Sequence, residues 1–174
     1  MKDLGRTKFC LSLQIEHLPS GILIYQSTYT EKVLKRFYMD KAHPLSSPMI
    51  VQSLDVKKDL FRPLEESEEI LGPEVPYLSA IGTLMYLGNC TRPDIAFAVN
   101  LLAWYSSTPA RRHWNGVKHI MRYLRETTDM GLFYARKLKP QLIGYADAGY
   151  LSDPHTARSQ TWYLFTCGGT AKSW

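Results

Sequence analysis

The stretch LIGYADAGYLSD, residues 142–153, joins strand-forming residues to a carboxylate. Leu142, Ile143 and Tyr145 predict a buried strand, and Asp147 follows at the end of that strand. A carboxylate is costly to bury without a partner, so Asp147 is expected to hold something. The stretch therefore marks Asp147 as a candidate functional residue, although the strand does not identify its partner.

A second candidate group lies in TPARRHWNGVKHIMRYLRET, residues 108–127, which predicts an amphipathic helix with no acidic residue between Ala110 and Arg125. For an isolated helix, this pattern favours a solvated face beside a core stripe over a phosphate-binding face. His113 and His119 are six residues apart, which is not the spacing of a helical metal pair, so both are expected at the surface or facing phosphate. One face is apolar (Trp114, Val117, Ile120, Met121, Leu124), and the adjacent face is basic (Arg111, Lys118, Arg122, Arg125).

The elements that must position these residues follow from periodicity. Residues 8–17 alternate apolar and polar side chains, and the turn LPSG leads into the apolar residues 22–26, so a β-hairpin is predicted. Residues 28–37 predict a short amphipathic helix in which Thr28 and Glu31 have the spacing of a capping box.

Residues 41–75 lack a regular pattern and include an acidic run, which indicates a linker with solvated carboxylates rather than a metal site. Residues 76–127 predict three successive helices, with Thr91 as a candidate N-cap of the second. Short strands are predicted beyond them, at 132–135, 141–147 and 161–167.

The composition, 45% hydrophobic and 21% charged, is that of a folded protein. Its three cysteines form no C-x-x-C pair, so neither a disulfide framework nor a thiolate zinc site is indicated. No signal peptide and no membrane span are evident, so we expect a protein that is not secreted, has no membrane partner, and is cytoplasmic or nuclear. A net charge of +5 is compatible with an anionic partner without requiring one.

Three blocks, YLSAIGTLMY (77–86), TRPDI (91–95) and YADA (145–148), occur in an order that resembles the Pol polyprotein of copia-type retrotransposons. The resemblance runs from the end of the reverse transcriptase into the start of ribonuclease H and covers almost the whole chain. It implies an α+β fold with two parts. Residues 1–127 would be the C-terminal part of a reverse transcriptase, with a hairpin, a helix, the linker 41–75 and a three-helix thumb-like bundle at 76–127. Residues 128–174 would begin an incomplete ribonuclease H-like antiparallel sheet.

The same resemblance implies a role for Asp147. In the family this aspartate is one of several carboxylates that bind two magnesium ions for phosphodiester cleavage. The other carboxylates of that cluster have no counterpart in this sequence. Asp153 lies in an SDPH turn, where aspartate is more often a local cap, and His155 belongs to the same loop. The adjacent aspartates of the polymerase site are also missing, so we expect incomplete catalytic and metal sites that hold no Mg²⁺ stably.

In the family the third helix follows the template and primer backbones, which gives its cations a function that periodicity alone did not supply. The candidate nucleic-acid-binding residues are Arg111, Arg112, Lys118, Arg122 and Arg125. Ser12 and Trp162 stand where relatives usually carry glycine, and Lys172 stands where they carry a β-branched residue. A large side chain at Trp162 and a charge on a buried strand at Lys172 are expected to be unfavourable.

These observations lead to the hypothesis of a retrotransposon-derived fragment without catalysis of its own, with residual sequence-independent binding of RNA or DNA. Two alternatives stay open. One is a ribonuclease H subunit that completes its metal site in an oligomer. The other is a host-recruited protein-interaction module. The oligomeric state is not predicted.

Overall fold

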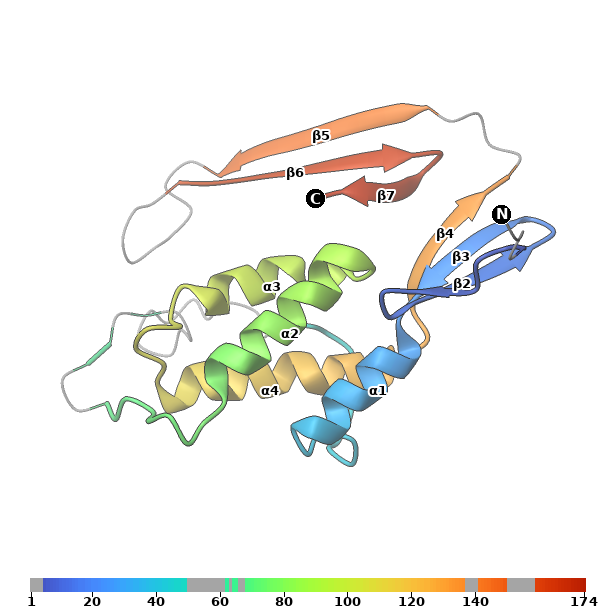
Figure 1. The fold of residues 1–174 in the computed structure, drawn as a ribbon. Coiled ribbons are helices and arrows are strands. Elements are labelled where there is room, and N and C mark those ends of the chain that lie inside the picture. The colour runs from blue at the N-terminus through green and yellow to red at the C-terminus, as the bar shows by residue number, and fades with distance from the viewer. Residues whose placement is uncertain (1–4, 50–61, 63, 66–67, 137–140, 150–158) are drawn as a thin grey trace.

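The computed structural model describes residues 5–49, 62, 64–65, 68–136, 141–149 and 159–174 (Figure 1). Helices pack together on one side, and two antiparallel sheets lie beside and above them, which confirms the α+β class. The thumb-like and ribonuclease H-like arrangements stay predictions. The helices are α1 (Ser27–Arg36), α2 (Tyr77–Cys90), α3 (Pro93–Ala103) and α4 (Arg111–Glu126). The strands are β1 (Phe9–Cys10), β2 (Leu13–Leu18), β3 (Gly21–Tyr25), β4 (Gly131–Ala135), β5 (Leu142–Gly149), β6 (Gln160–Cys167) and β7 (Thr170–Ser173).

The hydrophobic core lies among the helices, where α2, α3 and α4 contact one another and α1 packs on α4. The predicted apolar stripe of α4 is confirmed, because each of its five members is buried. Leu84 of α2, Ile95 of α3 and Leu124 of α4 are fully enclosed. None of the helices in the described part combines the length and the apolar composition needed to cross a membrane.

The first sheet has the strand order β1-β2-β3-β4. The β2–β3 hairpin is local, whereas β4 follows α4 in the chain and pairs with β3 along its length. Gly131, the first residue of β4, lies so close to the backbone of Ile24 that a side chain there would collide with it. Because β3 directly precedes α1 and β4 follows α4, the pairing of these two strands joins the start and the end of the helical region.

The strand predicted for residues 8–17 is interrupted, because Leu11 and Ser12 form a two-residue turn between β1 and β2. Both residues have positive φ angles, 47° and 63°. This is the type I′ geometry that suits the twist of paired strands and favours Asn-Gly. A glycine at position 12, which the family resemblance leads us to expect, would therefore fit this left-handed backbone position.

The predicted caps were wrong at two helices. No side-chain bond caps α1 from Thr28, and Gln26 occupies the N-cap position. The oxygen of Gln14 on β2 instead accepts bonds from the Ser27 hydroxyl and the Thr28 amide, both at 2.9 Å. Arg92, not Thr91, is the N-cap of α3. At α1 a partner from another segment therefore took the place of the local cap that spacing suggested, whereas no side-chain bond caps α3.

The second sheet has the order β5-β6-β7 and lies above α3 (Figure 1). Among the described residues, side-chain bonds attach it to the rest of the chain: Tyr134 donates to Ala171 O at 2.9 Å, Thr170 donates to Phe133 O, and Trp174 donates to Gly88 O at 2.8 Å. The prediction that β5 is buried was wrong, because its side chains are exposed up to Ala148. Among the described strands, β5 pairs with β6 alone, so it is an edge strand.

We expect Ser12→Gly to raise the free energy of unfolding by about 1 kcal/mol, because glycine adopts a left-handed backbone without steric penalty. Urea denaturation at equilibrium measures the change. Ser20→Gly is the matched control, because Ser20 lies in the neighbouring hairpin turn and does not have a positive φ. An equal or lower stability of Ser12→Gly relative to the wild type would contradict the assignment of the turn.

Candidate nucleic-acid interface

Four of the five candidate cations share one face of α4. At about 100° per residue, Arg111, Lys118, Arg122 and Arg125 fall within an arc of about 60°, and Arg112 lies about 100° away from Arg111. The basic face, defined as these four residues, runs beside the buried stripe of the same helix. The five predicted residues are therefore not one surface.

Arg112 lies outside this face and forms an ion pair with another segment. One of its terminal nitrogens lies 3.3 Å from Glu68 and donates to Arg62 O at 2.7 Å. Glu68 also pairs with Arg62 at 3.0 Å. The side chains of Arg112 and Glu68 are only 13% and 20% exposed, so water screens the pair weakly. Arg112 therefore holds Arg62 and Glu68 against the start of α4.

Arg122 and Arg125 also contact the segment that was predicted to be a linker. Arg122 Nε donates to His43 O at 2.5 Å, and Arg125 donates to Ala42 O. The amide of Leu45 in turn donates to Arg122 O at 3.3 Å. Residues 42–45 thus lie along α4. The groups that accept bonds from Arg122 and Arg125 are neutral backbone carbonyls. They orient both guanidinium groups without cancelling their positive charge.

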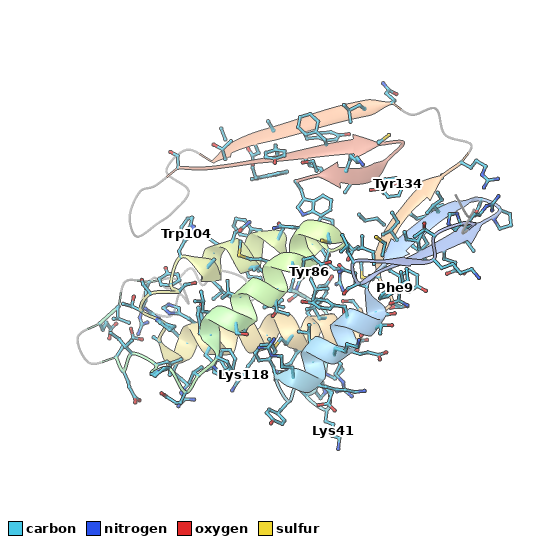
Figure 2. All side chains as sticks on the ribbon, in the orientation of Figure 1. Phe9, Lys41, Tyr86, Trp104, Lys118 and Tyr134 are labelled. Carbon is cyan, nitrogen blue, oxygen red and sulfur yellow. The ribbon has the colours of Figure 1, made fainter. Side chains whose placement is uncertain are left out.

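The remaining two cations differ in exposure. Arg111 is exposed at the first position of α4. Lys118 is half-buried, and its ammonium lies 5.7 Å from the centre of the Trp114 ring, a cation–π contact (Figure 2). Within the described residues, no carboxylate forms an ion pair with any member of the basic face. Among the described residues, the four positive charges of this face are therefore not neutralised by a carboxylate.

The expectation that His113 lies at the surface was wrong. It is fully buried, its ring stacks on Tyr105 with 3.9 Å between centroids, and its Nδ1 accepts a bond from the Ala110 amide at 3.0 Å. Burial lowers the pKa of His113 to about 4; the charge of Glu68 opposes this shift and that of Arg62 adds to it. His113 is therefore a neutral cap at the start of α4 rather than a phosphate ligand.

His119 lies on the same side as the chain segment 42–49. Its Nε2 is 3.1 Å from Ser47 O, and the residue is partly buried. Burial lowers the pKa of His119, the bond to Ser47 opposes the shift, and the charge of Arg122 adds to it.

Asp147 lies within β5, not at its end, and its carboxylate is exposed. Its Oδ2 accepts a bond from the indole of Trp162, the residue directly opposite on β6, at 3.1 Å. The burial that made Asp147 unusual in the sequence does not occur. In the part of the chain that the structure describes, no three metal-ligating side chains converge. Asp153 and His155 lie outside the described residues.

The two side chains that were expected to disturb the sheet, Trp162 and Lys172, are accommodated. Trp162 is 50% exposed, and Lys172 is exposed, so the predicted crowding and desolvation are absent at these positions. A feature that sequence reasoning missed is a cavity of about 710 Å³ between α3 and β6. Its only signal in the sequence was the spacing of Phe97, Asn100 and Trp104, which places them on one side of a helix.

We expect the stability of the fold to decrease as the pH falls from 6.5 to 4, because the unfolded chain protonates His113 in that window and the folded chain does not. A shift of this size corresponds to about 3 kcal/mol. Urea denaturation across this range measures the slope. His119→Asn serves as the background, because the pKa of His119 is lowered too. If adding His113→Asn leaves the slope unchanged, His113 is not the titrating group.

Comparison with known proteins gives the following relatives. The chain is 41% identical over its whole length to the retrovirus-related Pol polyprotein from transposon TNT 1-94 of Nicotiana tabacum, and 31% identical over its whole length to that from transposon RE2 of Arabidopsis thaliana. It spans only 13% and 11% of these two proteins. Over 58% of its length it is also 44% identical to secreted RxLR effector protein 161 of Plasmopara viticola, of which it covers 70%.

No protein-family model matches the chain, and no solved structure matches it. The full-length similarity to two plant Pol polyproteins agrees with the order of the YLSAIGTLMY, TRPDI and YADA blocks. The chain belongs to the Pol polyprotein family of copia-type retrotransposons.

Proposed function

We propose that this chain binds the phosphate backbone of RNA or DNA without sequence preference and does not itself catalyse cleavage or synthesis. The observation that carries the proposal is the basic face of α4. Arg111, Lys118, Arg122 and Arg125 lie on one side of the helix with no carboxylate partner among the described residues. Lysine and arginine contacts to phosphate supply affinity but do not read base sequence.

The contacts of the basic face with residues 42–43 favour binding rather than oppose it. Each bond from Arg122 or Arg125 uses one of the five donors of a guanidinium and holds the side chain in place. A side chain that is already oriented loses less conformational entropy when it binds an anion. Residues 42–43 therefore support two cations whose charges still face a ligand.

The proposal that the chain lacks catalysis rests on Asp147. Cleavage by two metal ions needs several carboxylates around both ions. Asp147 is the one acidic residue in the described part of β5–β7, and its Oδ2 is occupied by the Trp162 indole. Because the chain spans a small share of its Pol relatives, the activities of the whole polyprotein are not assigned to it.

Binding to an RNA/DNA hybrid is expected to weaken steeply with salt, with a slope of log K against log salt of about −3 for four phosphate contacts. The double variant Arg111→Gln, Lys118→Gln removes two cations that make no bonds to residues 42–45, and it should reduce that slope by about 2. Fluorescence anisotropy of a labelled hybrid at several salt concentrations measures both slopes.

The matched control is the double variant Arg136→Gln, Lys172→Gln, which removes the same charge from exposed positions, one directly after β4 and one on β7. It should lower affinity slightly and leave the slope close to that of the wild type. Equal effects of the two double variants would show that only net charge matters, and the assignment of α4 as the interface would fail.

Incubation of the purified chain with an RNA/DNA hybrid and magnesium is expected to produce no cleavage above a blank, for the wild type and for Asp147→Asn alike. Gel electrophoresis of end-labelled RNA measures the products, with a complete ribonuclease H as the positive control. Magnesium-dependent cleavage that Asp147→Asn abolishes would overturn this part of the proposal. It would favour a metal site that is completed between chains.

A further inference from the structure

The cavity between α3 and β6 is not used by the function proposed above. Its volume of about 710 Å³ falls within the range of about 300 to 1,000 Å³ that is usual for small-molecule sites. Phe97 and Trp104 line it from the side of α3, Trp162 from β6, and Trp174 from the end of β7. The walls of the cavity are therefore rich in aromatic rings.

These rings are accessible rather than packed away. Phe97 is 49% exposed, Trp104 is 51% exposed and Trp162 is 50% exposed. Phe97 and Trp104 are seven residues apart and so lie on one side of the chain at α3, and both line the cavity together with Trp162 of β6. The helix α3 lies below the β5–β6–β7 sheet (Figure 1). Half-exposed aromatic faces on opposite walls suit a flat apolar ligand that stacks between them.

Two of the indoles are fixed in orientation by their own hydrogen bonds. Trp162 donates to Asp147 at 3.1 Å, and Trp174 donates to Gly88 O at 2.8 Å. Because both N–H groups are already paired within the protein, these rings offer a ligand their faces rather than a donor. A wall that is held in place before binding reduces the entropy lost on binding.

The polar side chains of the cavity indicate which hydrogen-bonding groups a ligand would need. Asn89 at the end of α2 and Asn100 on α3 contribute side-chain amides, each with a donor and an acceptor. Among the described residues that line the cavity, none has a charged side chain. An amide suits the hydrogen-bonding edge of a nucleobase, as asparagine does with adenine, and a lining without charged side chains has no cation to attract a phosphate.

We propose that this cavity binds a single unpaired nucleobase, stacked against the aromatic walls and hydrogen-bonded by Asn100. The base has a flat π face and a polar edge, the two features that the lining matches. The inference does not rest on the proposed backbone binding, since the two sites share no residue and differ in charge. The base can come from a free nucleoside or from an unstacked position in a single strand.

Isothermal titration calorimetry with adenosine tests the site directly. We expect saturable binding whose affinity is the same at low and high salt, because no charged group participates. Trp104→Ala should weaken binding about tenfold or more, and Trp104→Phe, which keeps a stacking ring, should retain most of the affinity. Absence of adenosine binding, or a steep salt dependence, would overturn the proposal.

Asn100→Ala and Asn115→Ala form a matched pair, because both asparagines are exposed on helices and only Asn100 lines the cavity. Asn100→Ala should lower the affinity for adenosine, and Asn115→Ala should not. Equal affinities of the two variants would refute recognition by Asn100. The variant Arg111→Gln, Lys118→Gln should retain adenosine binding, so failure of backbone binding and failure of this site are distinguishable.

Competition identifies the source of the base. Single-stranded oligo(dA) that displaces adenosine, when an abasic strand of equal length does not, supports a base presented by a strand. Adenosine binding that neither strand disturbs supports a free nucleoside. Equal displacement by both strands would mean that the backbone, and not the base, occupies the site, and would overturn the proposal.

Discussion

The arrangement of the helices depends on the guanidinium of Arg92, which is buried where α3 begins. It pairs with Asp94 at 2.7 Å, donates to Thr127 O at 2.9 Å, and lies 5.4 Å from the centre of the Tyr123 ring. A buried charge is tolerated only when its partners are in place. Burial alone would raise the pKa of Asp94, but Arg92 and the Tyr123 hydroxyl together hold that pKa below its ordinary value. The start of α3 is thereby joined to the end of α4.

Thr91, the residue before Arg92, connects the helices to the first sheet. Thr91 donates to the side chain of Gln26 at 2.8 Å, and both residues are buried. Gln26 follows β3 and precedes α1, while β4 leaves the end of α4 and pairs with β3. The TRPDI block therefore occupies the point at which the sheet and three helices meet, and it sets the position of α4 and of its basic face.

The cations of α4 were predicted as one group, but in the structure they contact different partners. Periodicity assigns each residue to a face of the helix but does not say which segment covers that face. Arg112 and Arg122 bind parts of a segment without any regular pattern, so no local signal announces the contact. His113 shows the same limit of periodicity. It was expected at the surface, but it is buried and caps α4 through its contacts with Ala110 and Tyr105.

The sequence by itself determined the three helices, the apolar stripe of α4, the β2–β3 hairpin and the family, because each depends on neighbours within a few residues or on an ordered set of motifs. Only the tertiary structure decided that β5 is an exposed edge, that Asp147 bonds to Trp162, and that a cavity lies between α3 and β6. The physical reason is that burial and pairing belong to the segments that meet, and those segments are far apart in the chain.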